Sequence, residues 1–264
     1  MQGADEDPPG AHDETMCPQS NRVSVIIPVR DDAVSLERCL ELLARQSVHP
    51  HEVIVVDDGS SDSSGTVARR EGARVIANTG SGIASARATG FDAATGDLLA
   101  TLDADCRAPA DWIAEIVAGL RATTTTAVTG GARFHDGPRA LRRVAAALYL
   151  GSFFAAVTLA LGHPPVFGSN YAMRATAWRA IRPDVHLDDE LLHDDMDVSY
   201  HLGPAHRIRY SRRLRMTISM RPLFDARAFL LRLHRGWHTV VIHWPAELPW
   251  LRWVRTGRRR RRIA

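Results

Sequence analysis

The hydrophobic positions in the first half of the chain follow two alternating spacings. Short apolar runs rich in β-branched residues predict four buried strands, at 23–29, 53–56, 74–77 and 98–102. Apolar residues at three- and four-residue spacing predict a helix after each strand, near 36–43, 63–71, 82–95 and 113–120. Parallel strands need crossover connections, and a helix after each strand provides them. The predicted fold class is therefore α/β and Rossmann-like: a mostly parallel central sheet flanked by helices, with a helical C-terminal extension.

Acidic residues follow two of these predicted strands. Asp103 and Asp105 come directly after the run that ends at Leu102, while Asp57 and Asp58 end the second strand. Ligands of open α/β sheets bind at the carboxyl ends of the strands, so both pairs are expected in one crevice. A hard divalent cation prefers carboxylate oxygens and keeps other positions for phosphate oxygens and water. The pair at 103 and 105 therefore predicts a metal site, the alternative being a solvated or helix-capping pair.

Composition narrows the class of protein. A chain of 264 residues that is 45% hydrophobic can bury a full core as one domain or slightly more. Its three cysteines have no metal-site spacing and cannot all pair, which favours a reducing, cytoplasmic setting. All 33 basic residues are arginine, so a Walker-type phosphate lysine and Schiff-base chemistry are both excluded.

Charge is distributed unevenly along the chain. Residues 1–21 contain five acids and no arginine and lack the pattern of a signal peptide, so a disordered acidic segment is expected there. Residues 207–264 contain sixteen arginines against two acids. The expected organisation is a folded domain over 22–223, followed at 224–264 by an amphipathic helix and a basic tail rich in tryptophan and arginine.

Six segments occur in an order that resembles family 2 glycosyltransferases with the A-type nucleotide-sugar fold. They span about residues 22–205 and read VIIPVRDD (25–32), VVDDGSSD (55–62), NTGSGIASARATG (78–90), LDAD (102–105), GSNYAMR (168–174) and HDDMDV (193–198). The resemblance implies a donor-binding half at 22–132 and an acceptor half at 133–223. It implies a metal-dependent, inverting, nonprocessive enzyme that moves a sugar from a nucleotide-diphosphate sugar to an acceptor hydroxyl.

The resemblance also implies roles for individual residues on the donor side. Asp105 would bind Mg²⁺ or Mn²⁺ directly, and Asp103 would contact the ribose, a metal-bound water or the metal itself. Asp58 would accept a hydrogen bond from the ring N–H of the base, with Asp57 supporting its loop. The alternative for these last two residues is turn formation, which their Gly-Ser-Ser context also favours.

Other residues would complete the nucleotide pocket. Pro28, Arg30 and Asp32 would form a second wall, and Arg87 occupies the position of a family arginine that faces the nucleotide. The family often has an aromatic residue and an asparagine where this chain has Arg30 and Asp31, so the identity of the base stays open. Arg87 could also be an ordinary surface charge.

An inverting transferase needs a general base for the acceptor hydroxyl. Asp195 aligns with the aspartate of the family's Glu-Asp pair, here Asp194-Asp195, and is the expected base. Asp197 would begin the following helix or support the base, and His193 is an alternative base. A further alternative is that the acids of 188–197 form a solvated face.

The resemblance weakens beyond residue 205. His234, Arg235 and Trp237 match the Gln-x-x-Arg-Trp segment of processive members only in part, and His234 or Arg235 could close over the diphosphate. An amphipathic helix over 225–244 is the preferred interpretation, and processive synthesis is not expected.

Two segments suggest contact with a membrane. Residues 144–162 are uncharged and nearly long enough to cross a bilayer. A lone span there would put Asp103 and Asp195 on opposite sides of the membrane, so a core or interfacial helix is predicted. The tail combines tryptophans with the arginines of 255–262, which is typical of an anchor on anionic lipid. The alternatives for this tail are disorder or nonspecific contact with RNA.

These features predict a cytoplasmic enzyme, peripheral at the inner face of the plasma membrane, that acts on a sugar, lipid-linked or glycolipid acceptor in cell-envelope synthesis. Three other classes of protein fit the sequence less well. A nucleotidyltransferase would need a glycine-rich basic loop, which residues 28–32 lack. No specific nucleic-acid partner is expected, because residues 1–206 hold 28 acids against 17 arginines. A non-catalytic sugar-nucleotide-binding module would not need the carboxylates at 103, 105 and 195.

Overall fold

The computed structural model describes residues 21–189, 191–203, 206–221 and 226–263. The acidic segment predicted at 1–21 therefore lies, except for its last residue, outside the described residues. The described chain forms one sheet of seven strands: β1 (Val23–Val29), β2 (Glu52–Asp57), β3 (Arg74–Ala77), β4 (Leu98–Thr101), β5 (Ala127–Phe134), β6 (Tyr171–Arg174) and β7 (Ile208–Ile218). Their order across the sheet is β3-β2-β1-β4-β6-β5-β7.

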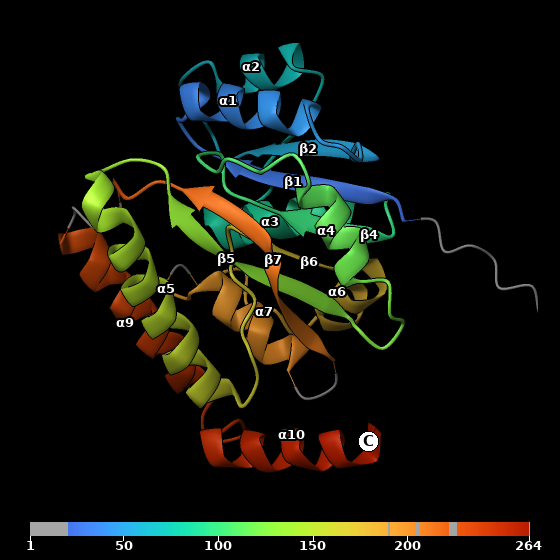
Figure 1. The fold of residues 1–264 in the computed structure, drawn as a ribbon, viewed down its shortest axis with the longest axis vertical. Coiled ribbons are helices and arrows are strands. Elements are labelled where there is room, and N and C mark those ends of the chain that lie inside the picture. Colours follow the sequence, from blue (N-terminus) through green and yellow to red (C-terminus); the bar gives the residue numbers. More distant parts are fainter. Residues whose placement is uncertain (1–20, 190, 204–205, 222–225, 264) are drawn as a thin grey trace, which may run out of the picture.

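Strand directions confirm a mostly parallel sheet. β1 pairs in parallel with β2 and β4, β2 with β3, and β5 with β7. β6 runs antiparallel to both of its neighbours, β4 and β5, which makes the sheet mixed. Figure 1 shows this sheet in the middle of the molecule. The helices are α1 (Ala33–Ala44), α2 (Ser64–Arg70), α3 (Gly82–Ala93), α4 (Trp112–Gly119), α5 (Arg139–Leu161), α6 (Ala175–Ile181), α7 (Asp194–Leu202), α9 (Ala226–Ile242) and α10 (Pro249–Ile263).

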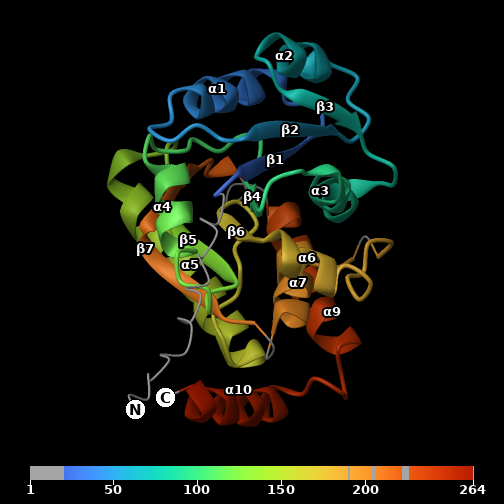
Figure 2. The same cartoon turned by 90° about the vertical axis from the view of Figure 1, so that its right-hand side faces the viewer.

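Helices cover both faces of the sheet (Figure 2). On one face, Val25 and Ile27 of β1 belong to a core that includes residues of α1, α4 and α5. On the other face, Ile26 belongs to a core with residues of α3, α6 and α7. Successive strand residues point to opposite faces, and both faces are covered, so all seven residues of β1 are buried. The continuous apolar run that predicted this strand is the sequence pattern of such two-sided burial.

Helices α5, α9 and α10 lie at the end of the molecule opposite α1 and α2 (Figure 1). α10 packs on the end of α5, where the buried side chain of Arg252 donates to the carbonyl of Leu161 at 2.8 Å. α5 has the length and composition of a membrane-spanning helix, and 22% of its most apolar window is buried. That low burial fits the interfacial interpretation of this segment better than the core interpretation.

Candidate active site

A cleft of about 420 Å³ opens where β1 and β4 end and α7 begins. Its lining contains most of the residues predicted for donor binding and catalysis, namely Pro28, Arg30, Asp32, Arg87, Asp103, Asp105 and Asp195. Of the described residues predicted for the nucleotide pocket, Asp57 and Asp58 lie outside this lining. The fold thus brings together donor-side residues and the expected base, which lie up to 167 positions apart in the chain.

Asp103 and Asp105 follow β4 and face this cleft. Asp103 accepts hydrogen bonds from Arg87 and from the hydroxyl of Ser169, both at 2.5 Å. Asp105 accepts one from Arg221 at 3.2 Å, and Arg221 also reaches Asp32 at 3.2 Å. Burial raises the pKa of Asp105, and the negative charge of Asp103 raises it further. A cation between the two carboxylates would remove that repulsion.

The donor atoms at this position suit a hard divalent cation. Carboxylate oxygens of Asp103 and Asp105 and the sulfur of Cys106 lie within 4.8 Å of one another. Burial raises the pKa of the Cys106 thiol well above its usual value, so the sulfur stays protonated and is a poor ligand. Two carboxylates therefore remain as ligands, which is the set that Mg²⁺ or Mn²⁺ accepts alongside substrate phosphates.

Arg87 links the donor side of the cleft to the start of α7. Its side chain is buried, and its guanidinium pairs with Asp103 and with Asp194. Burial would lower the pKa of Arg87, but the charges of Asp194 and Asp103 raise it above its usual value, so the group stays charged. A Cβ at Gly168 would lie 2.8 Å from this guanidinium, so a larger residue there would displace Arg87 from its present position. Arg87 is thus no ordinary surface charge: its guanidinium holds two carboxylates of the cleft.

Asp195 lies in the first turn of α7, and each of its carboxylate oxygens faces a nitrogen atom. The backbone N–H of Gly168 donates to one oxygen at 2.8 Å, and Nδ1 of His193 lies 2.5 Å from the other. Burial would raise the pKa of Asp195, but His193, the Gly168 N–H and Arg87 together lower it. Burial would likewise lower the pKa of His193, yet the charge of Asp195 raises it. The pair is therefore an ionised carboxylate beside a protonated imidazole.

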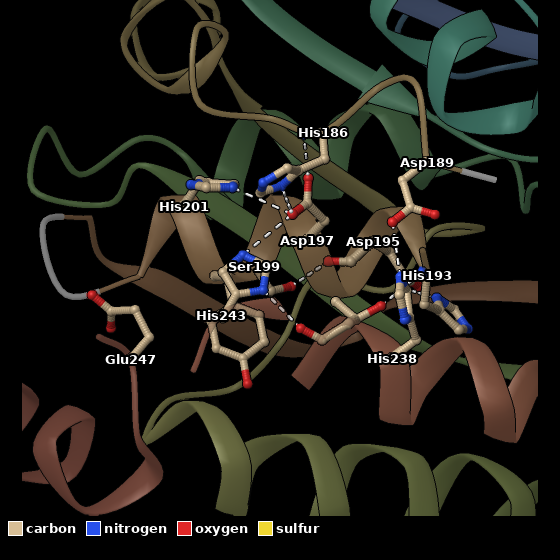
Figure 3. Close-up of polar contacts among 12 residues, drawn as sticks. His186, Asp189, His193, Asp195, Asp197, Ser199, His201, His238, His243 and Glu247 are labelled. Atoms are coloured by element: carbon tan, nitrogen blue, oxygen red, sulfur yellow. Dashed lines mark hydrogen bonds and ion pairs between the residues drawn. The ribbon is translucent and has the colours of Figure 1, made fainter. Parts of the chain in front are cut away.

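Asp197 is two residues further along α7 and faces away from the cleft. Its carboxylate contacts the imidazoles of His186, His201 and His243 (Figure 3). Both Asp195 and Asp197 are buried, so the interpretation of this acidic segment as a wholly solvated face is wrong for these two residues. The sequence placed Asp197 beside the base but contained no sign of its three histidine partners.

Asp57 and Asp58 order the loops beside the cleft. The backbone N–H of Ser60 donates to Asp57 at 2.8 Å, which is the turn role that the Gly-Ser-Ser context favours. Asp58 accepts hydrogen bonds from the side chain of Asn78 at 2.6 Å and from the backbone N–H of Gly82 at 3.1 Å. Arg30, which does line the cleft, lies 3.9 Å from Asp58. The base-reading role of Asp58 stays a prediction.

Asp31 lies in the short connection between β1 and α1. This residue has a φ of 50°, a left-handed conformation that Asp and Asn tolerate better than most residues. Its carboxylate accepts hydrogen bonds from the backbone N–H and the hydroxyl of Ser61 at 2.6 and 2.9 Å. The aspartate that replaces the family's usual asparagine therefore joins the first wall of the pocket to the loop after β2.

An apolar groove of about 320 Å³ between α5 and α9 adjoins the cleft. Tyr149, His193 and Arg232 line both. Among the described residues of the partial processive motif, Arg235 lines the cleft and Trp237 lines the groove, whereas His234 lines neither. Beside these shared residues, the polar cleft therefore continues into an apolar groove.

Comparisons with known proteins identify related sequences. The family model described as "Glycosyl transferase family 2" matches residues 24–181. The undecaprenyl-phosphate 4-deoxy-4-formamido-L-arabinose transferase of Serratia proteamaculans is 42% identical over 106 residues, which cover 36% of this chain and 32% of that protein. Glycosyltransferase AglE of Haloferax volcanii is 33% identical over 120 residues, which cover 42% of this chain and 40% of that protein. The matched segments thus span only a third to two fifths of these relatives.

Solved structures share the fold at lower identity. A mannosyltransferase from Pyrobaculum calidifontis, solved with GDP-Man and Mn²⁺, superposes with a TM-score of 0.56 at 24% identity, over 75% of this chain and 56% of that one. TarS of S. aureus (residues 1–349) superposes with the same TM-score of 0.56 at 17% identity, over 81% of this chain and 65% of that one. At such identities the likeness concerns the fold alone, and it agrees with the A-type architecture expected from the sequence.

Proposed function

The chain belongs to glycosyl transferase family 2, and on that premise we propose that it is a metal-dependent, inverting, nonprocessive enzyme. It transfers a sugar from a nucleotide-diphosphate donor to the hydroxyl of a lipid-linked or glycolipid acceptor. The observation that carries this proposal is the cleft that holds Asp103, Asp105 and Asp195 together. Two carboxylates for a metal and one buried, ionised carboxylate for a proton are the groups that such a transfer needs.

Asp103 and Asp105 would hold the cation on the donor side. Bound there, Mg²⁺ or Mn²⁺ supplies positive charge for the departing diphosphate. Arg221, which pairs with Asp105 in this structure, is 64% exposed in its side chain, so its displacement costs little. Arg87 keeps Asp103 in place from the protein side.

Asp195 takes the proton of the acceptor hydroxyl. His193 and the N–H of Gly168 keep the carboxylate ionised and oriented before the acceptor arrives. A base for the acceptor that is separate from the carboxylate pair supports the inverting part of the proposal. Nonprocessive transfer rests on the partial match of residues 234–237 to the segment of processive members.

The groove between α5 and α9 supports a lipid-linked acceptor. It is lined by apolar side chains such as Phe153, Val157 and Trp237, and it meets the cleft beside His193 and Arg232. An acceptor with an apolar chain and a polar, anionic head would fit both parts. The name of the Serratia relative, a transferase of undecaprenyl phosphate, points to the same acceptor class.

A screen of nucleotide sugars tests the donor half of the proposal. We expect one class of UDP-, GDP- or dTDP-sugar to bind and to be slowly hydrolysed, only in the presence of Mg²⁺ or Mn²⁺. Isothermal titration and release of the nucleoside diphosphate would measure both. Undiminished activity in excess chelator would contradict metal dependence. Consumption of a nucleoside triphosphate and a sugar phosphate would instead identify a nucleotidyltransferase.

Peripheral attachment to the inner face of the plasma membrane is the second part of the proposal. Exposed apolar side chains occur on all three helices at this end of the molecule, including Leu148 of α5, Trp237 of α9 and Trp250 of α10. Arg255 is an exposed residue of α10 as well. Each arginine near an anionic surface contributes about 1 kcal/mol to the free energy of membrane binding. Each apolar side chain that becomes buried in the membrane adds about 1.5–3 kcal/mol.

Flotation with liposomes tests this attachment. The full chain is expected to float with anionic vesicles at low salt and to dissociate at high salt. Trp237→Ser combined with Trp250→Ser should weaken binding about tenfold or more, because the double variant loses two insertable side chains. Val34→Ser on α1 is the control, since Val34 is 82% exposed but lies at the opposite end of the molecule. If the unmodified chain stays in the soluble fraction at low salt, the membrane proposal is wrong and a soluble acceptor replaces it.

A further inference from the structure

Three imidazoles and one carboxylate meet outside the cleft, and the proposed transfer reaction uses none of them. His186 precedes α7, Asp197 and His201 lie one turn apart on α7, and His243 directly follows α9. One ligand atom from each lies within 4.8 Å of the others. Figure 3 shows the three rings directed at Asp197 from these separate elements. This group of four is called the histidine cluster below.

The distances converge on one oxygen. Oδ1 of Asp197 lies 2.9 Å from Nδ1 of His186, 3.3 Å from Nε2 of His201 and 3.3 Å from Nε2 of His243. Within the described chain, the two Nε2 atoms are buried and have no hydrogen-bond partner. The side chain of His243 is only 7% exposed. Two buried ring nitrogens thus face a carboxylate without making a hydrogen bond to it.

The hydrogen bond of His243 shows which of its ring nitrogens carries the proton. Its Nδ1 lies 2.7 Å from the carbonyl oxygen of Thr239, which can only accept, so Nδ1 carries the proton. In the neutral ring, Nε2 then presents a lone pair to the lone pairs of Asp197. Two acceptors that face each other repel unless a cation lies between them. That cation is either a proton on Nε2 or a metal ion.

A metal ion fits better than protons alone. The centroids of the three rings lie 5.3–5.5 Å apart, so two or three protonated rings would repel one another. A metal ion avoids this repulsion, because it binds neutral imidazoles together with one ionised carboxylate.

The geometry also agrees with a tetrahedral ion. With bonds of about 2.0–2.1 Å to nitrogen and oxygen, the ligand atoms of a tetrahedral Zn²⁺ lie about 3.3–3.4 Å apart. The contacts of His201 and His243 with Asp197 are both 3.3 Å, and the contact of His186 is 2.9 Å, so His186 would move outward by about half an ångström on binding. Outer contacts already orient two ligands: Thr239 holds the ring of His243, and the backbone N–H of His186 donates to the other oxygen of Asp197 at 2.9 Å.

We propose that His186, Asp197, His201 and His243 bind one divalent ion of the zinc type. Imidazole nitrogens select such ions over Mg²⁺, so this site differs in chemistry from the carboxylate pair of the cleft. With four protein ligands the ion is structural rather than catalytic. It joins the end of α9 and the segment before α7 to α7 itself, whose first turn carries Asp194 and Asp195. The ion would enter past His186, because the side chain of His186 is 46% exposed.

Metal binding to the full chain, prepared without a histidine tag and stripped by chelator, tests the proposal. We expect one equivalent of Zn²⁺ to remain bound after gel filtration, as measured by elemental analysis. Excess Mg²⁺ should not displace it. Co²⁺ in its place should give the intense visible absorption of a tetrahedral site. These measurements need no variant and no transferase activity, so they stand apart from any test of the proposed function.

Variants then locate the ion. His201→Ala combined with His243→Ala should bind Zn²⁺ at least about 100-fold more weakly, since two of four ligands are lost. His238→Ala should keep it: that residue also lies on α9 but pairs with Asp189 at 2.8 Å. Asp105→Ala should keep it too, which separates this site from the donor metal. The proposal is overturned if the unmodified chain binds no Zn²⁺, if Co²⁺ shows only weak octahedral absorption, or if the double variant binds as tightly as the unmodified chain.

Discussion

Replacing Asp105 with alanine is expected to lower sugar transfer about 10³-fold or more while the protein stays folded. A bound divalent cation stabilises the departing diphosphate by several kcal/mol, and each 1.36 kcal/mol corresponds to a tenfold change in rate. Asp105 lies at the end of β4 and has only the exposed Arg221 as a partner among the described residues. Its removal should therefore abolish metal-dependent donor binding without disturbing the core.

Thermal unfolding in metal-free buffer separates this effect from misfolding. Burial and the adjacent charge of Asp103 raise the pKa of Asp105. Without a metal, the ionised form of Asp105 therefore lowers the stability of the folded protein. The variant should therefore unfold at the same temperature as the unmodified protein or higher. Asp111→Ala is the control, because Asp111 is exposed, lies outside the cleft and makes no side-chain cap to α4. Normal turnover in Asp105→Ala, or a large fall in its unfolding temperature, would rule out the assigned role.

Replacing Asp195 with asparagine is expected to lower turnover about 10²-fold or more, the usual range for loss of a general base. The amide keeps the shape of the carboxylate and can still contact Gly168 and His193. Donor affinity, measured by titration with the metal present, should hardly change, because Asp103 and Asp105 are untouched. Asp189→Asn is the control: it removes a carboxylate of the same acidic segment that pairs with His238 outside the cleft.

The pH profile decides between Asp195 and His193 as the base. The pKa of Asp195 is lowered from 3.8, so Asp195 is ionised throughout the neutral and mildly acidic range. The pKa of His193 is raised from 6.5, so His193 is protonated and cannot accept a proton until the pH exceeds that raised value. With Asp195 as the base, activity should show no acid limb near or above pH 6.5. An acid limb there that disappears in His193→Gln would move the assignment to His193.

The local pattern of the sequence was enough to predict the donor half of the fold. Strands β1 to β4 and the helices after them lie within a few residues of their predicted places, because the spacing of apolar residues reflects which side of each element is buried. The same locality placed Asp103 and Asp105 at a strand end, and the order of the motifs identified the family. β6, which runs antiparallel between β4 and β5, had no such signal because strand order depends on pairing across the whole sheet.

Only the tertiary structure decided what each side chain of the site contacts. Arg87 lies between Asp103 and Asp194, although 107 positions separate it from Asp194. Asp195 and Asp197 are two residues apart, so on α7 they point in different directions: Asp195 faces the cleft and Asp197 faces the histidine cluster. The sequence alone determined that the segment is acidic and begins a helix. Which carboxylate faces the cleft depends on which distant elements pack against each side of that helix. The spacing of residues along the sequence does not predict that packing.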